Sequence, residues 1–150
     1  MPGRCIRPIG YVEPDPIVRR IGERELYLGN EHAASDPDCG FDAVLSLTDD
    51  PRPATTHHRP LVDGPDIAWR PFRRAVDTGR RRFRRGESML VHCRAGVSRS
   101  STVLATTVAI EEQRPFRDAL AAVQRARPSA EPHPDLRTMA TIYLAASGER

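Results

Sequence analysis

The sequence predicts a single-domain α/β sandwich in which a central, mostly parallel sheet of four to five strands is flanked by helices. Two observations favour this class. Short apolar runs bounded by turn residues, which are typical of buried strands, occur up to residue 92, whereas long segments with helical periodicity dominate the remainder. The chain has 150 residues, 39% of them hydrophobic, so it is long enough to enclose one full-sized core.

The first part of the chain has the pattern of short strands between turns. Residues 1–21 contain four prolines and are predicted to form an irregular lead-in. Residues 25–29 are expected to form a strand that ends at a turn glycine, and a small helix follows over 32–35. The apolar run 43–48, closed by Asp-Asp-Pro, is typical of a buried strand. Residues 57–62 predict a weaker strand, because a proline interrupts it.

Helical periodicity dominates the second part. Between residues 68 and 85 apolar side chains recur on one helix face, and the single proline falls where a first turn tolerates it. Residues 89–92 form one more apolar strand. A helix from 99 to 113 is apolar nearly all round, which predicts that it is buried. Two further amphipathic helices follow, the first closed by Pro128 and the second opened by Pro134.

Composition limits the classes of function. No apolar run approaches the length of a membrane span and the first residues lack a signal-peptide core, so we expect a cytoplasmic protein without a membrane partner. Cys5, Cys39 and Cys93 are an odd number without paired spacing, which predicts neither a disulfide framework nor a metal site. The net charge is only +3. The basic run at 80–85 is expected to be a solvated helix end rather than a nucleic-acid surface, and a monomer is favoured.

Residues 92–100 carry the strongest chemical signal, His-Cys-Arg-Ala-Gly-Val-Ser-Arg-Ser, between the last strand and the buried helix. A thiol is mostly protonated at neutral pH, but inward-pointing backbone N–H groups and a helix N-terminus favour the thiolate. The same N–H groups can bind phosphate oxygens, and Arg99 can add a planar bidentate contact. Ser100 places a hydroxyl where it could hydrogen-bond the sulfur. The expected phosphate-binding residues are Arg94, Ala95, Gly96, Val97, Ser98 and Arg99.

This segment resembles the signature of the cysteine-based protein tyrosine phosphatase superfamily, and its Ala-Gly-Val-Ser-Arg-Ser ending is similar to that of the dual-specificity branch. The likeness covers roughly residues 22–146 and includes Leu-Tyr-Leu-Gly-Asn at 26–30 and Arg-Ala-Arg-Pro at 125–128. It implies a dual-specificity phosphatase-like catalytic domain over 22–150. Such a domain would hydrolyse phosphotyrosine, and phosphoserine or phosphothreonine where the pocket is shallow, in a phosphorylated protein or peptide.

The resemblance also implies a role for each matching residue. Cys93 would attack phosphorus and form a cysteinyl-phosphate, while Arg99 and the loop N–H groups stabilise the transferring phosphoryl group. Ser100 would help release the thiolate, and His92 would orient the loop and tune the thiol. The positive field of Arg99 and the loop dipoles takes the place of a metal, so no cofactor is expected.

The leaving group needs a proton, which the family takes from an aspartate on a loop about thirty residues before the cysteine. Asp63 fits best, because it lies thirty residues before Cys93 in an Asp-Gly-Pro turn after a strand. Asp66 is the second candidate, since one sequence does not fix the register of this loop.

Two alternatives to a protein phosphatase stay open at the level of the sequence. The same chemistry could act on a phosphoinositide, a nucleotide or an RNA 5′-phosphate, although Arg94 is the sole basic residue between Cys93 and Arg99. The loop could also bind phosphate without turnover, but an intact cysteine, arginine and serine argue against this.

Overall fold

A five-stranded sheet organises residues 12–147, the part of the chain that the computed structural model describes. Its spatial order is β1-β2-β5-β3-β4, with β1 antiparallel to β2 and every other pairing parallel. The mostly parallel sheet that the sequence predicts is therefore confirmed. The strands are β1 (Val18–Arg20), β2 (Leu26–Gly29), β3 (Ala43–Ser46), β4 (His57–His58) and β5 (Met89–His92).

Strand β1 corrects the expectation of an irregular lead-in over residues 1–21. Val18–Arg20 is exposed and pairs antiparallel with β2, so a sheet edge supplies order that local sequence does not indicate. Pro14 and Pro16 both precede this strand, where they do not interrupt its pairing. The remainder of that prediction, residues 1–11 with Cys5, lies outside the described residues.

Strand β4 is shorter than the predicted 57–62. The backbone N–H groups of Arg59 and Leu61 still donate to the carbonyls of Ser46 and Leu47, at 2.9 and 3.1 Å. Pro60 lies between them and has no N–H to donate, so the segment follows β3 without continuing as a regular strand.

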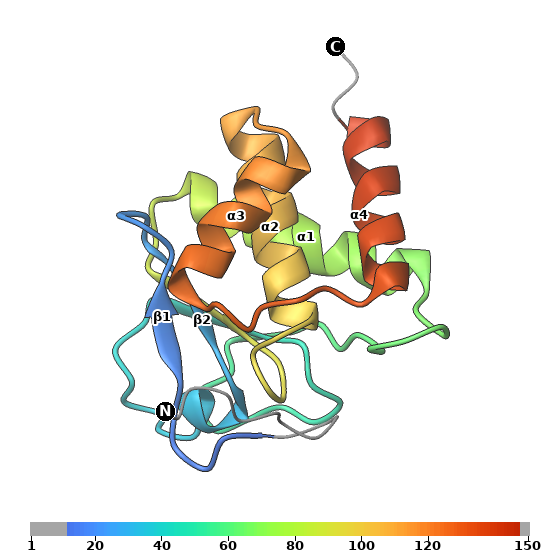
Figure 1. The fold of residues 1–150 in the computed structure, drawn as a ribbon. Helices are drawn as coiled ribbons and strands as arrows, with labels where there is room; N and C mark the ends of the chain where they lie inside the picture. Colours follow the sequence, from blue (N-terminus) through green and yellow to red (C-terminus); the bar gives the residue numbers. More distant parts are fainter. Residues whose placement is uncertain (1–11, 148–150) are drawn as a thin grey trace, which may run out of the picture.

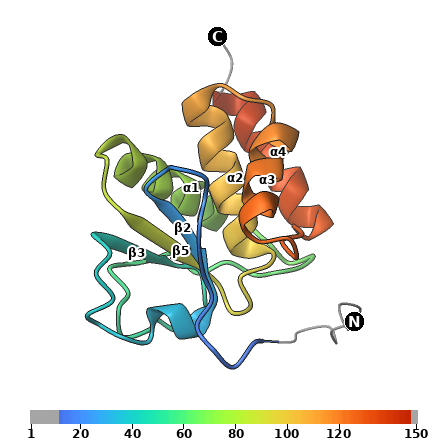
Figure 2. The ribbon, with the colours of Figure 1, turned by 60° about the vertical axis from the view of Figure 1, so that its left-hand side comes forward.

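Four α-helices pack on one side of the sheet, and the short 3-10 helix η1 (Glu31–Ala34) lies on the other (Figures 1 and 2). Helix α2 runs through the middle of the helical layer, between α1, α3 and α4 (Figure 1). None of the helices within residues 12–147 is long and apolar enough to cross a membrane. The helices are α1 (Trp69–Arg84), α2 (Arg99–Glu112), α3 (Phe116–Ala126) and α4 (Pro134–Ser147).

The period-two alternation of the strands divides the core into two layers. On the helix side, the side chains of Leu26, Leu28, Leu45, Met89 and Val91 join the main cluster. On the other side, Val44 and Leu90 pack with the alanines of η1. Strand β5 is covered by these layers on its two faces and is paired with β2 and β3 on its two edges. The loop that follows it therefore begins in the interior of the sheet.

The carboxyl ends of β2, β3 and β5 meet at one edge of the sheet, because these strands are parallel and adjacent. The residues that follow them, Asn30, Leu47 and Cys93, therefore lie close together. In open α/β sheets this edge is where ligands bind.

Candidate active site

The loop from Cys93 to Arg99 closes tightly because Gly96 adopts φ +70°, a conformation that side chains with a Cβ rarely adopt. A Cβ at this position would lie 2.9 Å from the carbonyl oxygen of Gly29. The loop thus turns directly against the end of β2, and no larger residue fits here without moving the backbone.

The loop carbonyls are turned outward by backbone donors from two other segments. The N–H of Glu31 donates to Arg94 O at 3.0 Å, and the N–H of Glu131 donates to Val97 O at 2.9 Å. In a peptide unit the N–H points opposite to the C=O. Outward carbonyls therefore leave the loop N–H groups facing the interior of the loop, as an anion-binding nest requires.

Arg127, at the end of α3, holds two more of these carbonyls. Its Nε and Nη2 donate to Gly96 O and Ala95 O at 3.2 and 3.1 Å, and its Nη1 pairs with Glu13 at 3.0 Å. The residue is only 6% exposed, so these bonds form away from water, where they are stronger. Arg127 is a positioning residue of the loop whose side chain the sequence did not assign.

The thiol lies beneath the loop, at the start of α2. Cys93 is 2% exposed, and its Sγ is 3.2 Å from Ser100 Oγ. Ser100 is itself fully buried in the first turn of α2. A serine hydroxyl at this distance can donate to a sulfur anion, and the positive end of α2 adds to the stabilisation.

One nitrogen of the Arg99 guanidinium is hydrogen-bonded to the protein and a second is not, within residues 12–147. Its Nη1 donates to the carbonyls of Leu47 and Leu61, at 3.3 and 3.1 Å. Its Nε is buried and, within the described part of the chain, has no hydrogen-bond partner. An unpaired buried donor is costly, so this nitrogen marks the place where an anion can be bound.

Asp63 is brought to the loop by Ser98. The N–H of His133 donates to Ser98 Oγ at 2.9 Å, which directs the hydroxyl hydrogen of Ser98 toward Asp63 Oδ1 at 2.8 Å. That hydrogen occupies Oδ1, so a proton carried by this carboxyl must sit on Oδ2. Asp66 is exposed, and no hydrogen bond within residues 12–147 links it to the loop.

His92 is enclosed in a chain of hydrogen bonds that fixes its neutral form. Its Nδ1 faces Cys93 O at 3.4 Å and must donate there, which leaves Nε2 to accept from Ser46 Oγ at 2.5 Å. Ser46 Oγ in turn lies 2.6 Å from Thr55 Oγ1, which accepts the N–H of Arg52. Burial, with smaller contributions from nearby arginines, lowers the pKa of His92 from 6.5 to about 4.

This pKa predicts how stability depends on pH. The unfolded chain binds a proton at His92 near pH 6.5 and the folded chain only near pH 4, so stability is lost as the pH falls between these values. The difference corresponds to about 3 kcal/mol. We expect chemical denaturation at pH 4.5 and 7.5 to show a larger drop for the wild type than for His92→Gln. Equal drops in the two proteins would contradict this assignment.

Two hollows open beside the loop. One, of about 200 Å³, is lined by Arg94 and Arg99 together with Glu31, Thr48, Asp49, Asp50 and Arg52. The other, of about 320 Å³, is lined by Asp63, Ser98 and the segment that joins α3 to α4. Within residues 12–147, no group of three or more histidine, cysteine, aspartate or glutamate side chains is arranged to hold a metal ion.

Known proteins with related sequences carry phosphatase names. The chain is 31% identical to human dual specificity protein phosphatase 15 over 134 residues, which are 83% of this chain and 45% of the relative. It is 33% identical to dual specificity protein phosphatase 22-B of Danio rerio over 118 residues, which are 73% of this chain and 64% of the relative. The chain spans about half the length of the first two curated relatives. No protein-family model matches it.

Solved structures match over most of both chains. A crystal structure of DUSP15 superposes with a TM-score of 0.75 at 28% identity, covering 88% of this chain and 90% of that one. A crystal structure of human DUSP28 gives a TM-score of 0.79 at 22% identity, covering 93% of this chain and 100% of that one, which is a likeness of fold alone.

Proposed function

Because the chain belongs to the dual-specificity branch of the cysteine-based protein tyrosine phosphatase superfamily, we propose that it hydrolyses phosphate monoesters on proteins by way of a cysteinyl-phosphate. The proposed substrates are phosphotyrosine and, in the second place, phosphoserine and phosphothreonine. The observation that carries the proposal is the buried Nε of Arg99, which has no hydrogen-bond partner among residues 12–147. It lies beside a loop whose carbonyls at Arg94, Ala95, Gly96 and Val97 are bonded by donors from outside the loop.

In the first step, the Cys93 thiolate attacks phosphorus and the bond from phosphorus to the leaving oxygen breaks. The loop N–H groups and the free side of the Arg99 guanidinium stabilise the charge on the three equatorial oxygens. Asp63 transfers the proton on Oδ2 to the leaving oxygen, so the product departs as a neutral alcohol or phenol.

In the second step, water attacks the cysteinyl-phosphate and the P–S bond breaks. Asp63, now a carboxylate, accepts the proton of that water. The electron pair returns to sulfur, and the hydroxyl of Ser100 donates to the thiolate that forms. The cycle ends with inorganic phosphate and with both side chains in their starting protonation states.

The test is hydrolysis of para-nitrophenyl phosphate in the presence of a chelator, followed by a panel of phosphopeptides, inositol phosphates and nucleotides compared by kcat/KM. We expect turnover in chelator and the highest kcat/KM on a phosphotyrosine peptide. A higher kcat/KM on an inositol phosphate or nucleotide would assign the chemistry to a non-protein substrate. Binding of phosphate without turnover would overturn the proposal.

Asp63→Asn is expected to lower kcat/KM, which reports only the step that expels the leaving group, about 10²–10⁴-fold on a phosphopeptide, whose leaving group is poor, because the general acid is lost. The loss should be much smaller on an activated aryl phosphate, because its phenolate is stable enough to leave without a proton. A series of aryl phosphates with leaving groups of rising pKa measures this difference as a steeper dependence of kcat/KM on leaving-group pKa.

Two matched variants complete that experiment. Asp66→Asn changes the same functional group three residues away and should leave the leaving-group dependence unaltered. Ser98→Ala keeps the Asp63 carboxyl but removes its donor, so the same dependence should steepen by a smaller amount. A steep dependence in Asp66→Asn and not in Asp63→Asn would assign the acid to Asp66.

The remaining features of the proposal concern the whole protein. We propose that the catalytic domain predicted over residues 22–150 begins earlier, at β1, since this strand completes the sheet edge. A cytoplasmic location suits a catalytic thiol, which needs a reducing compartment. We propose a monomer whose partner is the phosphorylated protein substrate.

A further inference from the structure

Four arginines at the outer side of α1 have no carboxylate partner within the described part of the chain: Arg59, Arg70, Arg74 and Arg81. Most arginines of the neighbouring basic run, residues 80–85, have a carboxylate partner. Arg80 and Arg84 pair with Glu111 at 2.5 and 2.8 Å, and Arg82 pairs with Glu87 at 3.3 Å. Within that run only Arg81 lacks a carboxylate partner in the described part of the chain, so the unpartnered guanidiniums of this region are those of Arg59, Arg70, Arg74 and Arg81.

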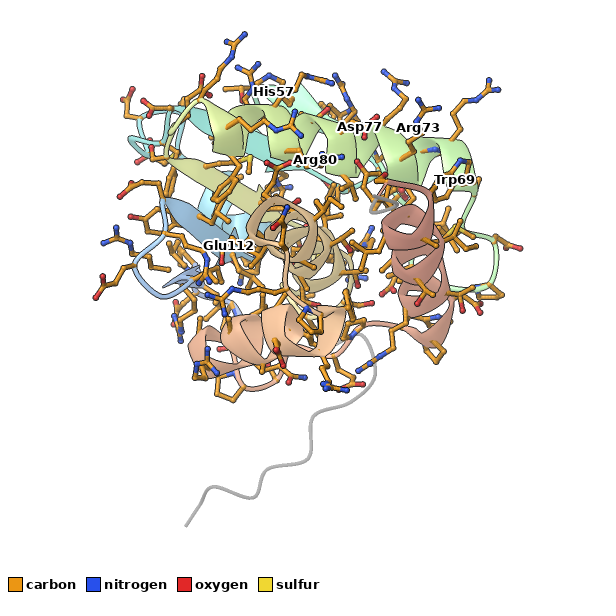
Figure 3. All side chains as sticks on the ribbon, turned by 90° about the horizontal axis from the view of Figure 1, so that it is seen from above. His57, Trp69, Arg73, Asp77, Arg80 and Glu112 are labelled. Carbon is orange, nitrogen blue, oxygen red and sulfur yellow. The ribbon has the colours of Figure 1, made fainter. Side chains whose placement is uncertain are left out.

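The four side chains belong to one surface. Arg70, Arg74 and Arg81 are spaced by four and seven residues, which places them on one face of α1. Arg59 joins them from the segment after β4, because its Nε donates to Thr78 Oγ1 of α1 at 3.1 Å. Figure 3 shows several nitrogen-tipped side chains projecting from the side of α1 that is turned away from α2.

The direction in which the pKa of Arg59 is shifted agrees with a cluster of positive charges that no carboxylate balances. Partial burial, together with the neighbouring guanidiniums of Arg74 and Arg81, lowers the pKa of Arg59 below its ordinary value. A cation in such surroundings is stabilised when an anion approaches.

The surface is hollowed where the arginines converge. A depression of about 180 Å³ is lined by His58, Arg59, Pro60, Arg70, Pro71 and Arg74, and we call it the arginine groove. Two proline rings supply its apolar part, while three guanidiniums can reach a bound group. No phenylalanine, tyrosine or tryptophan lines it, so it lacks the stacking platforms with which proteins bind single-stranded nucleic acid.

The arginine groove adjoins the candidate active site along the chain. Pro60 is followed by Leu61, whose carbonyl accepts a hydrogen bond from Arg99 at 3.1 Å. Asp63 comes three residues after Pro60, and three residues span at most about 11 Å. A peptide with its phosphorylated side chain at Cys93 can therefore reach the groove with a few flanking residues.

We propose that the arginine groove binds an acidic segment, rich in aspartate or glutamate, that flanks the phosphorylated residue of the protein substrate. This inference rests on the proposed phosphatase function. The clustered guanidiniums attract carboxylates over several ångströms, which raises the rate of encounter and selects among substrates that share the same phosphorylated residue. The groove acts on KM and leaves the chemical step unchanged.

The test compares two phosphotyrosine peptides of equal length, one with three glutamates beside the phosphotyrosine and one with three glutamines. For the double variant Arg70→Gln/Arg74→Gln we expect the kcat/KM of the glutamate peptide to fall about tenfold, through KM. The glutamine peptide and para-nitrophenyl phosphate should be unaffected. Raising the salt concentration should abolish the preference of the wild type for the glutamate peptide.

The control double variant, Arg73→Gln/Arg117→Gln, removes the same charge elsewhere. Arg73 pairs with Asp77 across one turn of α1, and the Arg117 side chain is 89% exposed on α3. Equal losses of kcat/KM on the glutamate peptide in the two double variants would show that the effect comes from the net charge of the protein, and would overturn the inference. Equal losses on the two peptides in Arg70→Gln/Arg74→Gln would also overturn it.

Fluorescence anisotropy of the unphosphorylated glutamate peptide separates this inference from the proposed function, because binding needs no turnover. Salt-sensitive binding that Arg70→Gln/Arg74→Gln weakens supports the groove, even if neither phosphopeptide is hydrolysed. An oligoribonucleotide that displaces the glutamate peptide at lower concentration than the peptide's own unlabelled form would assign the groove to nucleic acid and overturn the inference.

Discussion

Cys93→Ser is expected to lower the hydrolysis of para-nitrophenyl phosphate by at least about 10⁴-fold, which is effectively the background rate. A serine hydroxyl stays protonated at neutral pH and is a weak nucleophile without a base beside it. The hydroxyl of Ser100, which the structure places 3.2 Å from the sulfur, is another hydroxyl and cannot act as that base. Steady-state kinetics at saturating substrate measure the effect.

The variant should still bind phosphate, because the loop N–H groups and Arg99 are unchanged. Calorimetric titration with a phosphotyrosine peptide should therefore give an affinity close to the wild-type KM. A Cys93→Ser protein that turns over para-nitrophenyl phosphate within tenfold of the wild-type rate would show that the sulfur is not the nucleophile.

Arg99→Lys is the second large effect. We expect kcat/KM to fall about 10³–10⁵-fold, as for other arginines that stabilise a transferring phosphoryl group. The guanidinium bonds two carbonyls through Nη1 and keeps Nε for the substrate. A lysine ammonium is a point charge and cannot do both from one position. The loss should appear in kcat and in phosphate binding together.

The thermal midpoint of Arg99→Lys should stay near that of the wild type, because lysine can still donate to the carbonyl of Leu47 or Leu61. Arg94→Lys is the matched control. The side chain of Arg94 is 64% exposed and lies 3.9 Å from Glu31, so the exchange should change kcat/KM only slightly. Comparable losses in both variants would show that Arg99 contributes net charge and not a directed contact.

The sequence predicted those parts of the site that are local. Cys93, Arg99 and Ser100 lie within eight residues on a strand, a turn and a first helical turn, so spacing alone brings them together. The choice between Asp63 and Asp66 depended on how their loop is placed relative to Cys93, which one sequence does not determine. In the structure the position of Asp63 follows from Ser98, which bonds both Asp63 and the segment after α3.

Contacts between segments far apart in the chain could not be predicted from the sequence alone. Arg127 lies 31 and 32 residues after the two loop carbonyls that it holds, and its position just before a proline at a helix end was the one available signal. Ser46 reaches His92 because β3 and β5 pair in register, which requires knowledge of the sheet order. Strand β1 formed where prolines predicted irregular chain, since its order comes from β2.

The central claim is that phosphate is carried on the sulfur of Cys93, and trapping that adduct tests it most directly. Asp63→Asn, which cannot activate water for the second step, is mixed with an activated aryl phosphate, quenched in acid within milliseconds and digested for peptide mass spectrometry. We expect one phosphoryl group on the peptide that contains Cys93, removed by Cys93→Ser. A phosphoryl group on any other residue, or turnover without an adduct on this peptide, would contradict the mechanism.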